Sequence, residues 1–106
     1  MRCSIASLML SLALAGPAAA GEPAPAREAE LRNLLIQDCG SCHGLQMRGG
    51  LGPALLPANL DERPDAMLVA TILHGRHGTA MPAWRALLSE EDARWMVRAL
   101  RQGVGQ

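Results

Sequence analysis

Residues 38–44 read "DCGSCHG" and place two thiols, Cys39 and Cys42, three positions apart, with the imidazole of His43 directly after the second. Thioredoxin-like redox sites, zinc sites and covalent haem attachment sites all begin with a Cys-x-x-Cys pair. A thioredoxin-like dithiol is expected after a strand of a βαβ unit. Here an apolar pattern of helical spacing precedes the motif, which disfavours that class of site.

A zinc site could pair Cys39 and Cys42 with His74 and His77, but the two residues between these histidines are fewer than the usual spacing of about three to five. It would also leave His43 without a role. Haem attachment uses all three side chains, because the thiols form thioethers with the vinyl groups and the adjacent imidazole is then held under the iron. Residues 39–43 match that signature without a mismatch. The sequence therefore predicts one covalently attached haem c on Cys39 and Cys42, with His43 as proximal iron ligand.

A haem that carries electrons needs a second axial ligand, commonly Met or His. We expect Met81, in "GTAMPAW", because the flexible residues 78–80 precede it and Pro82 fixes the backbone after it. Thioether ligation raises the reduction potential. His74 and His77 are the alternatives, and ligation by two histidines would lower that potential.

Three other methionines are present in the main part of the chain. Met67 and Met96 have the helical spacing that is typical of packing residues, and we expect both in the core. Met47 is expected there too, but it lies in a loop and therefore remains a weaker alternative to Met81 as iron ligand.

Residues 1–20 have the pattern of a secretory signal peptide, with Arg2 before an apolar segment and a small-x-small site at Ala18 and Ala20. The apolar segment is shorter than the ~20 residues needed to cross a bilayer. A retained N-terminal anchor is the alternative. Cleavage after Ala20 would remove Cys3 and leave a periplasmic chain without a stable membrane anchor.

The rest of the chain is expected to form one small domain. Residues 21–27 read as a flexible Pro/Ala leader in which the prolines prevent a helix, and residues 28–106 as the domain. Beyond residue 20 the formal charge is 9 − 10 = −1, with arginine as the sole cation besides histidine. This charge excludes a basic field for nucleic acid, and the lack of lysine excludes a lysine-ringed docking face.

The domain is poor in aromatic residues, which normally supply the largest blocks of buried area. It has no Phe or Tyr, and its two tryptophans are Trp84 and Trp95. A domain this short is marginal without an additional stabilising element. A large apolar cofactor at its centre would supply one.

The hydrophobic pattern predicts an all-α fold with long loops. The predicted helices begin near Glu28, at Asp65 after Pro64, and after Ser89 as N-cap. The segments 45–64 and 75–84 are rich in glycine and proline and are predicted to be loops. The inward face of the last helix is predicted to be Trp95, Met96, Ala99 and Leu100.

Four stretches, "CGSCHG", "GGLGPAL", "ILHGRHGTAMPAW" and "LLSEEDARWMV", together resemble the single-domain class I cytochromes c. The glycine-rich stretches and the "Met-Pro-x-Trp" segment are most similar to the NirC-type periplasmic cytochromes, which occur with the nitrite reductase that carries haem c and haem d. The resemblance spans residues 31–103. It implies three to four helices wrapped around one haem, with the first and last helices crossing beside it.

Carried over to this chain, the resemblance implies haem attachment at Cys39 and Cys42, His43 as proximal ligand and Met81 as distal ligand. It also implies that the Pro53 carbonyl accepts a hydrogen bond from the free imidazole nitrogen of His43, which would fix the ring orientation.

Two departures concern the rest of the haem environment. His77 stands where the family pattern has a proline, and no Tyr is present to bond a haem propionate, which leaves Arg48, Arg76 and Trp84 as candidates. The cleft that holds the porphyrin is expected to be lined by Leu55, Leu56, Ile72, Leu73 and Trp95.

With both axial positions filled, no substrate binds at the iron, so the sequence predicts a one-electron carrier and not an enzyme. By resemblance, its partner would be periplasmic nitrite reductase in denitrification, and the carrier is expected to be a monomer. A second hypothesis is a redox role in haem d biosynthesis and reductase maturation. A third, a haem sensor or catalytic site with an open sixth position, would require Met81 to be absent or labile.

Overall fold

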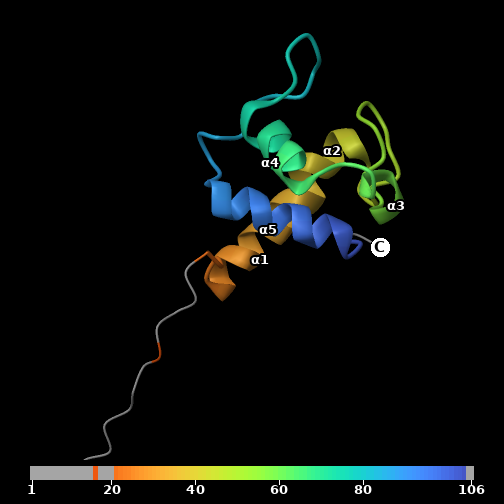
Figure 1. Cartoon of the computed structure of the whole chain (residues 1–106). Helices are drawn as coiled ribbons and strands as arrows, with labels where there is room; N and C mark the ends of the chain where they lie inside the picture. Colours follow the sequence, from red (N-terminus) through yellow and green to blue (C-terminus); the bar gives the residue numbers. More distant parts are fainter. Residues whose placement is uncertain (1–15, 17–20, 105–106) are drawn as a thin grey trace, which may run out of the picture.

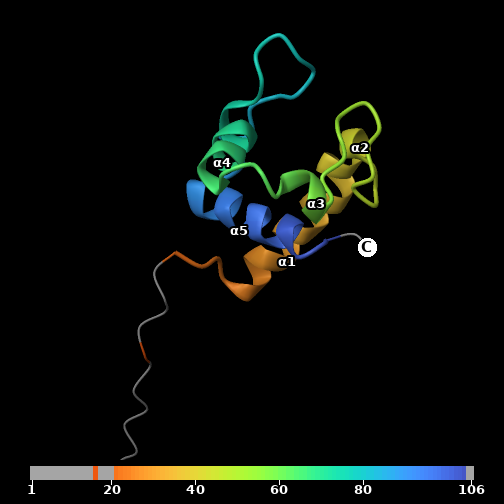
Figure 2. The same cartoon turned by 45° about the vertical axis from the view of Figure 1, so that its right-hand side comes forward.

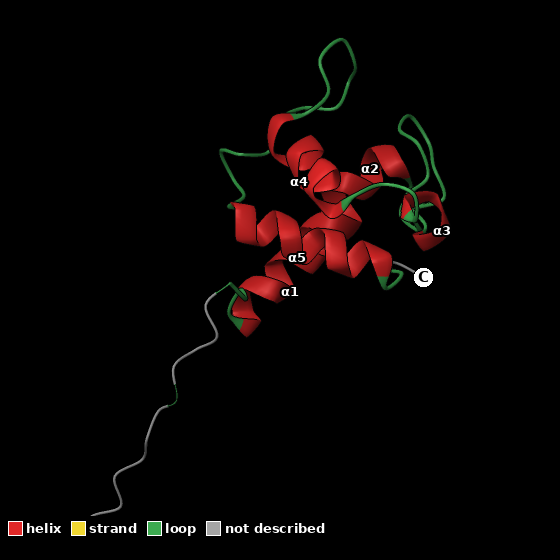
Figure 3. Ribbon diagram, viewed as in Figure 1, coloured by secondary structure: helices red, strands yellow, loops and turns green. Residues whose placement is uncertain are grey.

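The computed structural model describes residue 16 and residues 21–104. Within residues 21–104 every regular element is a helix, as Figure 3 shows, and the prediction of an all-α fold is confirmed. Apart from Gly16, the predicted signal peptide and Cys3 lie outside the described residues. Among the helices in the described part, none has the length and apolar character needed to span a membrane.

The chain first forms one continuous helical column from three elements: α1 (Pro25–Leu34), η1 (Leu35–Cys39) and α2 (Gly40–His43). It begins before Glu28, because Pro25 occupies the first turn, where its missing N–H is not needed and its fixed φ suits a helix. The prediction that the prolines keep residues 21–27 out of a helix is therefore wrong from Pro25 onwards. The element η1 is one wider π-helical turn, and Gly44 ends the column with φ +89°.

The last helix, α5 (Glu90–Arg101), begins as the sequence predicts. Ser89 Oγ accepts a hydrogen bond from the Asp92 N–H at 3.0 Å, and Asp92 Oδ2 accepts one from the Ser89 N–H at 3.1 Å. This reciprocal capping satisfies two backbone donors at the start of the helix. The predicted inward face is confirmed, with all four of its residues buried: Trp95, Met96, Ala99 and Leu100.

Two helices lie between the column and α5 in the chain. The helix α4 (Asp65–His74) has its predicted ends. The predicted loop 45–64 is not entirely irregular, because Pro57 begins the single turn α3 (Pro57–Leu60). Met67 is 44% exposed, so its assignment to the core is wrong. The face of α4 that packs on α5 centres on Val69, which clusters with Ala93 and Val97.

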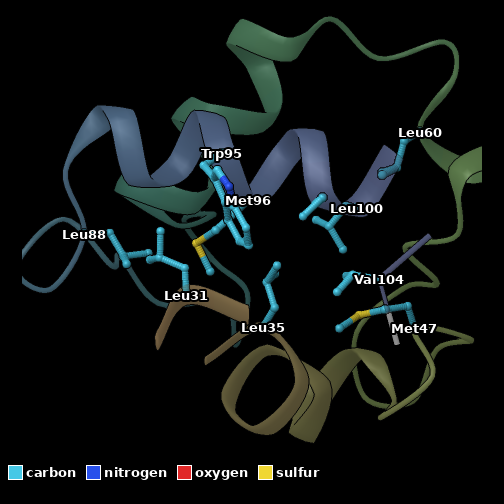
Figure 4. Packing of buried hydrophobic residues seen from close by; sticks show 10 residues of the cluster. Leu31, Leu35, Met47, Leu60, Leu88, Trp95, Met96, Leu100 and Val104 are labelled. Carbon is cyan, nitrogen blue, oxygen red and sulfur yellow. The ribbon is translucent and has the colours of Figure 1, made fainter. Parts of the chain in front are cut away.

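The helix α5 is the centre of the fold and contacts α1, α3 and α4. Figures 1 and 2 show α1 and α5 crossing. Their crossing forms the main core, in which Leu31 and Leu35 face Trp95 and Met96, as Figure 4 shows. Met47 enters the same core from the loop after α2 and is 0% exposed. Its place in the core is confirmed, and the alternative role as iron ligand is not supported.

Two arginines fasten segments that are distant in the sequence. Arg27 of α1 donates to Asp92 Oδ2 at 2.8 Å and to the Leu87 carbonyl oxygen at 3.0 Å. Arg101 of α5 donates to Asp65 Oδ1 at 2.7 Å and to the Leu60 carbonyl oxygen at 3.0 Å. The guanidinium of Arg27 holds the pKa of the Asp92 carboxyl below its ordinary value. The ends of α5 are thereby joined to α1 on one side and to α3 and α4 on the other.

Candidate haem site

The two cysteines of the motif lie at the end of the helical column. Cys39 is the last residue of η1 and Cys42 lies in α2; both are half-buried free thiols. Burial raises the pKa of the Cys39 thiol to about 11, and the charge of Asp38 adds to this effect. A thiol that stays protonated at neutral pH is a poor redox nucleophile.

The zinc alternative also fails on geometry. Within residue 16 and residues 21–104, no three or more His, Cys, Asp or Glu side chains come close enough together to hold a metal ion. The structure therefore does not bring His74 and His77 to Cys39 and Cys42.

His43 is the buried member of the motif, 9% exposed. Its Nδ1 lies 2.7 Å from the carbonyl oxygen of Pro53. Because a carbonyl oxygen can only accept a hydrogen bond, Nδ1 carries the proton in this contact and donates it. Neutral imidazole then has its lone pair on Nε2, which is the atom left to bind a metal. This is the contact that the family resemblance implies.

The loop after α2 folds back over the motif through backbone hydrogen bonds. The N–H of Gly49 donates to the His43 carbonyl oxygen and the N–H of Gly52 donates to the Cys42 carbonyl oxygen, both at 2.8 Å. These bonds satisfy carbonyl groups that the end of a helix leaves without a partner.

Gly52 has a second role that the sequence analysis did not assign. A Cβ atom at residue 52 would lie 2.8 Å from Cε1 and 2.9 Å from Nδ1 of His43. The residue must therefore be glycine for the imidazole to keep its place. The sequence signal for this role was the stretch "GLGP", in which Gly52 directly precedes Pro53, the residue that hydrogen-bonds to His43.

Met81 lies half-buried near the base of the loop between α4 and α5. The Arg76 N–H donates to the Met81 carbonyl oxygen at 3.2 Å, and the Trp84 N–H donates to the Ile72 carbonyl oxygen at 3.1 Å. Gly75, with φ +69°, lies so close that a Cβ there would be 2.7 Å from the Met81 carbonyl oxygen. The backbone of Met81 is therefore held against the end of α4 while the loop tip extends outward.

Both histidine alternatives to Met81 are exposed. His77 lies in the outer part of the loop. His74 lines a cavity between α4 and α5 with Asp65, Glu90 and Arg94. Ile72 and His74 are about 200° apart around the helix, and Ile72 packs on the main core. The side chain of His74 is thus directed to a different face of α4.

Four of the five residues expected to line the porphyrin cleft are half-buried and pack against the main core: Leu55, Leu56, Ile72 and Leu73. The fifth, Trp95, is 7% exposed and belongs to the core itself. Leu55 and Leu56 lie in the loop after α2, and Ile72 and Leu73 lie in the last turn of α4. The loop after α2 and the loop that directly follows α4 both extend upward in Figures 1 and 2. Two free thiols, an imidazole with Nε2 available and apolar side chains with remaining exposed surface fit a covalently attached haem.

Of the candidate partners for the haem propionates, Trp84 is half-buried, whereas Arg48 and Arg76 are exposed. In the described part of the chain, neither arginine side chain forms an ion pair with a carboxylate. The propionate contacts stay a prediction.

The comparisons with known proteins agree with this site. The family model described as cytochrome C oxidase, cbb3-type, subunit III, matches residues 16–98. A cytochrome c55X of Pseudomonas aeruginosa is 54% identical over 98 residues, which cover 92% of this chain and 82% of that protein. The dihydro-heme d1 dehydrogenase of the same organism is 40% identical over 82 residues, which cover 77% of this chain but 17% of the dehydrogenase.

Among solved structures, one titled c-type cytochrome NirC is 57% identical and superposes with a TM-score of 0.75, covering 76% of this chain and 95% of that chain. The match to the family model includes the whole stretch from Cys39, the first cysteine of the motif, to the start of α5. The chain therefore belongs to the class I c-type cytochromes, the electron carriers that hold haem c covalently, and among them it is a relative of cytochrome c55X.

Proposed function

We propose that this cytochrome is a periplasmic one-electron carrier with a single haem ligated by His43 and Met81, and that it donates electrons to nitrite reductase. The observation that carries the proposal is the contact between His43 Nδ1 and the Pro53 carbonyl oxygen at 2.7 Å, because it leaves Nε2 for the iron. The bound haem supplies the one-electron couple. The residues of the chain hold it, orient the proximal imidazole and fill the opposite axial position.

The fixed backbone of Met81 supports a thioether as the distal ligand. The loop base is closed on both sides of Met81 by the backbone bonds of Arg76 and Trp84, which hold the backbone of this residue at the end of α4. His74 is directed to another face of α4, and His77 lies in the outer loop. A filled sixth position leaves no site for a substrate, which agrees with a carrier that is not an enzyme.

The proposed route to the periplasm is the signal peptide of residues 1–20. Cleavage there would release the leader and the domain, with residues 28–106 forming the cytochrome unit. Mass spectrometry of the secreted protein tests this division, since the mature N-terminus should be Gly21. An N-terminus at Met1 would favour the retained anchor.

Nitrite reductase is proposed as the acceptor because a solved relative carries the NirC name and the sequence resembles the NirC-type cytochromes. Stopped-flow mixing of the reduced cytochrome with the haem c and haem d nitrite reductase tests the pairing. We expect fast oxidation of the cytochrome. A rate no higher than with an unrelated cytochrome c of similar potential would reject nitrite reductase as partner.

A separate observation supports a second candidate function. The dihydro-heme d1 dehydrogenase contains a stretch 40% identical to this chain. The same kind of domain is therefore joined to an enzyme whose name concerns haem d1, which supports a redox role in haem d biosynthesis. Deletion of the gene separates the two functions. Nitrite reductase without haem d in the deletion strain would support maturation, whereas a complete reductase that lacks electrons would support respiration.

A haem sensor or catalyst with an open sixth position is the third candidate. Carbon monoxide should bind the reduced protein at neutral pH if that position is open. We expect no binding by the native protein.

A further inference from the structure

Met47 has a backbone conformation that is unusual for its residue type. Its φ is +57°, and every other residue with a positive φ in the described part of the chain is a glycine. Glycine adopts this left-handed region without steric cost, whereas a residue with a side chain is strained there. A methionine at such a position indicates that its side chain makes contacts that offset the strain.

The contacts of the Met47 side chain fasten the loop after α2 to the core. Within residues 44–54, Met47 is the only buried residue and the only member of the main core, and its exposed fraction is 0%. The same core contains Leu100, near the end of α5, and Val104, which follows that helix. Figure 4 shows Met47 at the Val104 end of the core. One buried side chain thus holds the first part of this loop.

The backbone of Met47 closes the part of the loop that reaches the imidazole. Its carbonyl oxygen accepts a hydrogen bond from the Leu55 N–H at 2.9 Å. The residues enclosed by this bond, 48–54, include Pro53, whose carbonyl oxygen lies 2.7 Å from His43 Nδ1. The side chain of Pro53 is exposed and does not hold this carbonyl group in the core. The position of the carbonyl therefore depends on how Met47 is held.

We propose that Met47 is a positioning residue for the proximal histidine, because its buried side chain holds the loop in which Pro53 accepts the hydrogen bond of His43. This bond increases the basicity of the imidazole, which favours ferric iron and lowers the reduction potential. Loss of the Met47 side chain should therefore raise the potential. The proposal rests on His43 as proximal ligand, but neither on Met81 nor on the identity of the electron acceptor.

Two methionines of the same core provide a matched pair of variants for the holoprotein. Met47 and Met96 are both 0% exposed, but Met96 lies on α5, and Figure 4 shows it apart from Met47. Met47→Ala and Met96→Ala should lower the urea midpoint of unfolding by similar amounts, since each removes a buried methionine side chain. A redox titration should give a higher midpoint potential for Met47→Ala and the native potential for Met96→Ala. The far-red absorption of the ferric protein should be native in both.

Exchange of the His43 Nδ1 proton with deuterium, followed by NMR in the reduced protein, reports on the hydrogen bond directly. Relative to the amides of α5, this proton should exchange about tenfold faster in Met47→Ala than in the native protein, because the loop then opens without unfolding of the helices. In Met96→Ala the proton and the α5 amides should change together. A residue that contributed only to global stability would not produce this difference.

Two further substitutions at residue 47 separate the side chain from the backbone strain. Met47→Leu keeps a large apolar side chain at the same φ and should keep the native potential and exchange rate. Met47→Gly relieves the strain but removes the buried side chain, so both measurements should give the result expected for Met47→Ala. Met47→Gly also serves as the truncated variant if Met47→Ala does not fold.

The native protein supplies a test that needs no variant. The Leu55 N–H, which donates to the Met47 carbonyl oxygen, should be protected from exchange as the amides of α5 are, because the side chain of Met47 ties this part of the loop to the core. A Leu55 amide that exchanges as fast as an unprotected one would show that the loop is not held in this way.

Two results from the variants would also overturn the proposal. A native potential and a native exchange rate in Met47→Gly would show that the backbone holds the loop without the side chain. Equal shifts of the potential in Met47→Ala and Met96→Ala would show that lost stability alone governs the potential. If the NMR signals of the His43 ring were not shifted by the haem, the proximal assignment would fail, and the proposal with it. Slow oxidation by nitrite reductase would reject that acceptor and leave all of these measurements unchanged.

Discussion

The imidazole of His43 packs so closely on Gly52 that a Cβ atom at residue 52 would come within 2.8 Å of its Cε1. Gly52 also donates its N–H to the Cys42 carbonyl oxygen, so the glycine cannot move away without losing that bond. The loop therefore fixes His43, the proposed proximal ligand, in two ways, by the hydrogen bond to Pro53 and by contact with Gly52.

Gly52→Ala should displace the His43 ring and weaken its bond to Pro53, because a Cβ at 2.8 Å is far inside van der Waals contact. We expect less haem per protein in a pyridine haemochrome assay and a changed midpoint potential in the fraction that retains haem. Leu51→Ala is the control, since the neighbouring Leu51 is 80% exposed. Native haem content and potential in Gly52→Ala would show that the loop adjusts at no cost.

Met81→Ala should remove the far-red charge-transfer absorption that a thioether ligand gives to ferric haem. It should also permit carbon monoxide to bind the reduced form, because the sixth position is then open, and lower the potential. Met67→Ala serves as control, since Met67 is exposed on α4. If the absorption persists in Met81→Ala, another methionine is the ligand. If the native protein lacks it, His77 becomes the leading candidate.

Met47→Ala should destabilise the fold without changing the haem spectrum. Met47 is 0% exposed, and truncation of a buried methionine costs about 3 kcal/mol of unfolding free energy, because it removes contacts and leaves a cavity. Urea unfolding followed by circular dichroism measures the loss. A spectral change with unaltered stability would contradict the assignment of Met47 to the core.

Asp92→Asn should lower the unfolding free energy by about 2 kcal/mol at pH 7, because a carboxylate that receives hydrogen bonds from Arg27 and Ser89 becomes a neutral amide. Arg27 lowers the pKa of Asp92 in the folded state. Its stabilising contribution is therefore complete above the unfolded pKa of about 4 and is lost as the pH falls below it.

Thermal unfolding of the native and Asp92→Asn proteins at pH 7 and pH 3 tests this dependence. The difference between them should shrink at the lower pH. Glu91→Gln, an exposed carboxylate in the same first turn, provides the control for the helix dipole. A difference that is equal at both pH values would contradict the role of the Asp92 charge.

The elements that the sequence predicted well depend on local signals. The motif of Cys39, Cys42 and His43 needs no structure to be recognised, because the attachment chemistry itself sets the spacing of the three side chains. Ser89 and Asp92 cap α5 through bonds between residues three apart, and the inward face of α5 follows from helical periodicity. The all-α class follows from the same periodicity.

The tertiary structure decided what depends on contacts between distant segments. Met47 and Met67 are the same residue type, yet one is enclosed in the core and the other is exposed, because α4 rests on α5 through Val69. The close approach of Gly52 to His43, nine residues earlier, becomes visible only when the loop has folded back. Sequence patterns specify which residues are apolar or can cap a helix. The packing of helices against one another determines which of those residues lose contact with water.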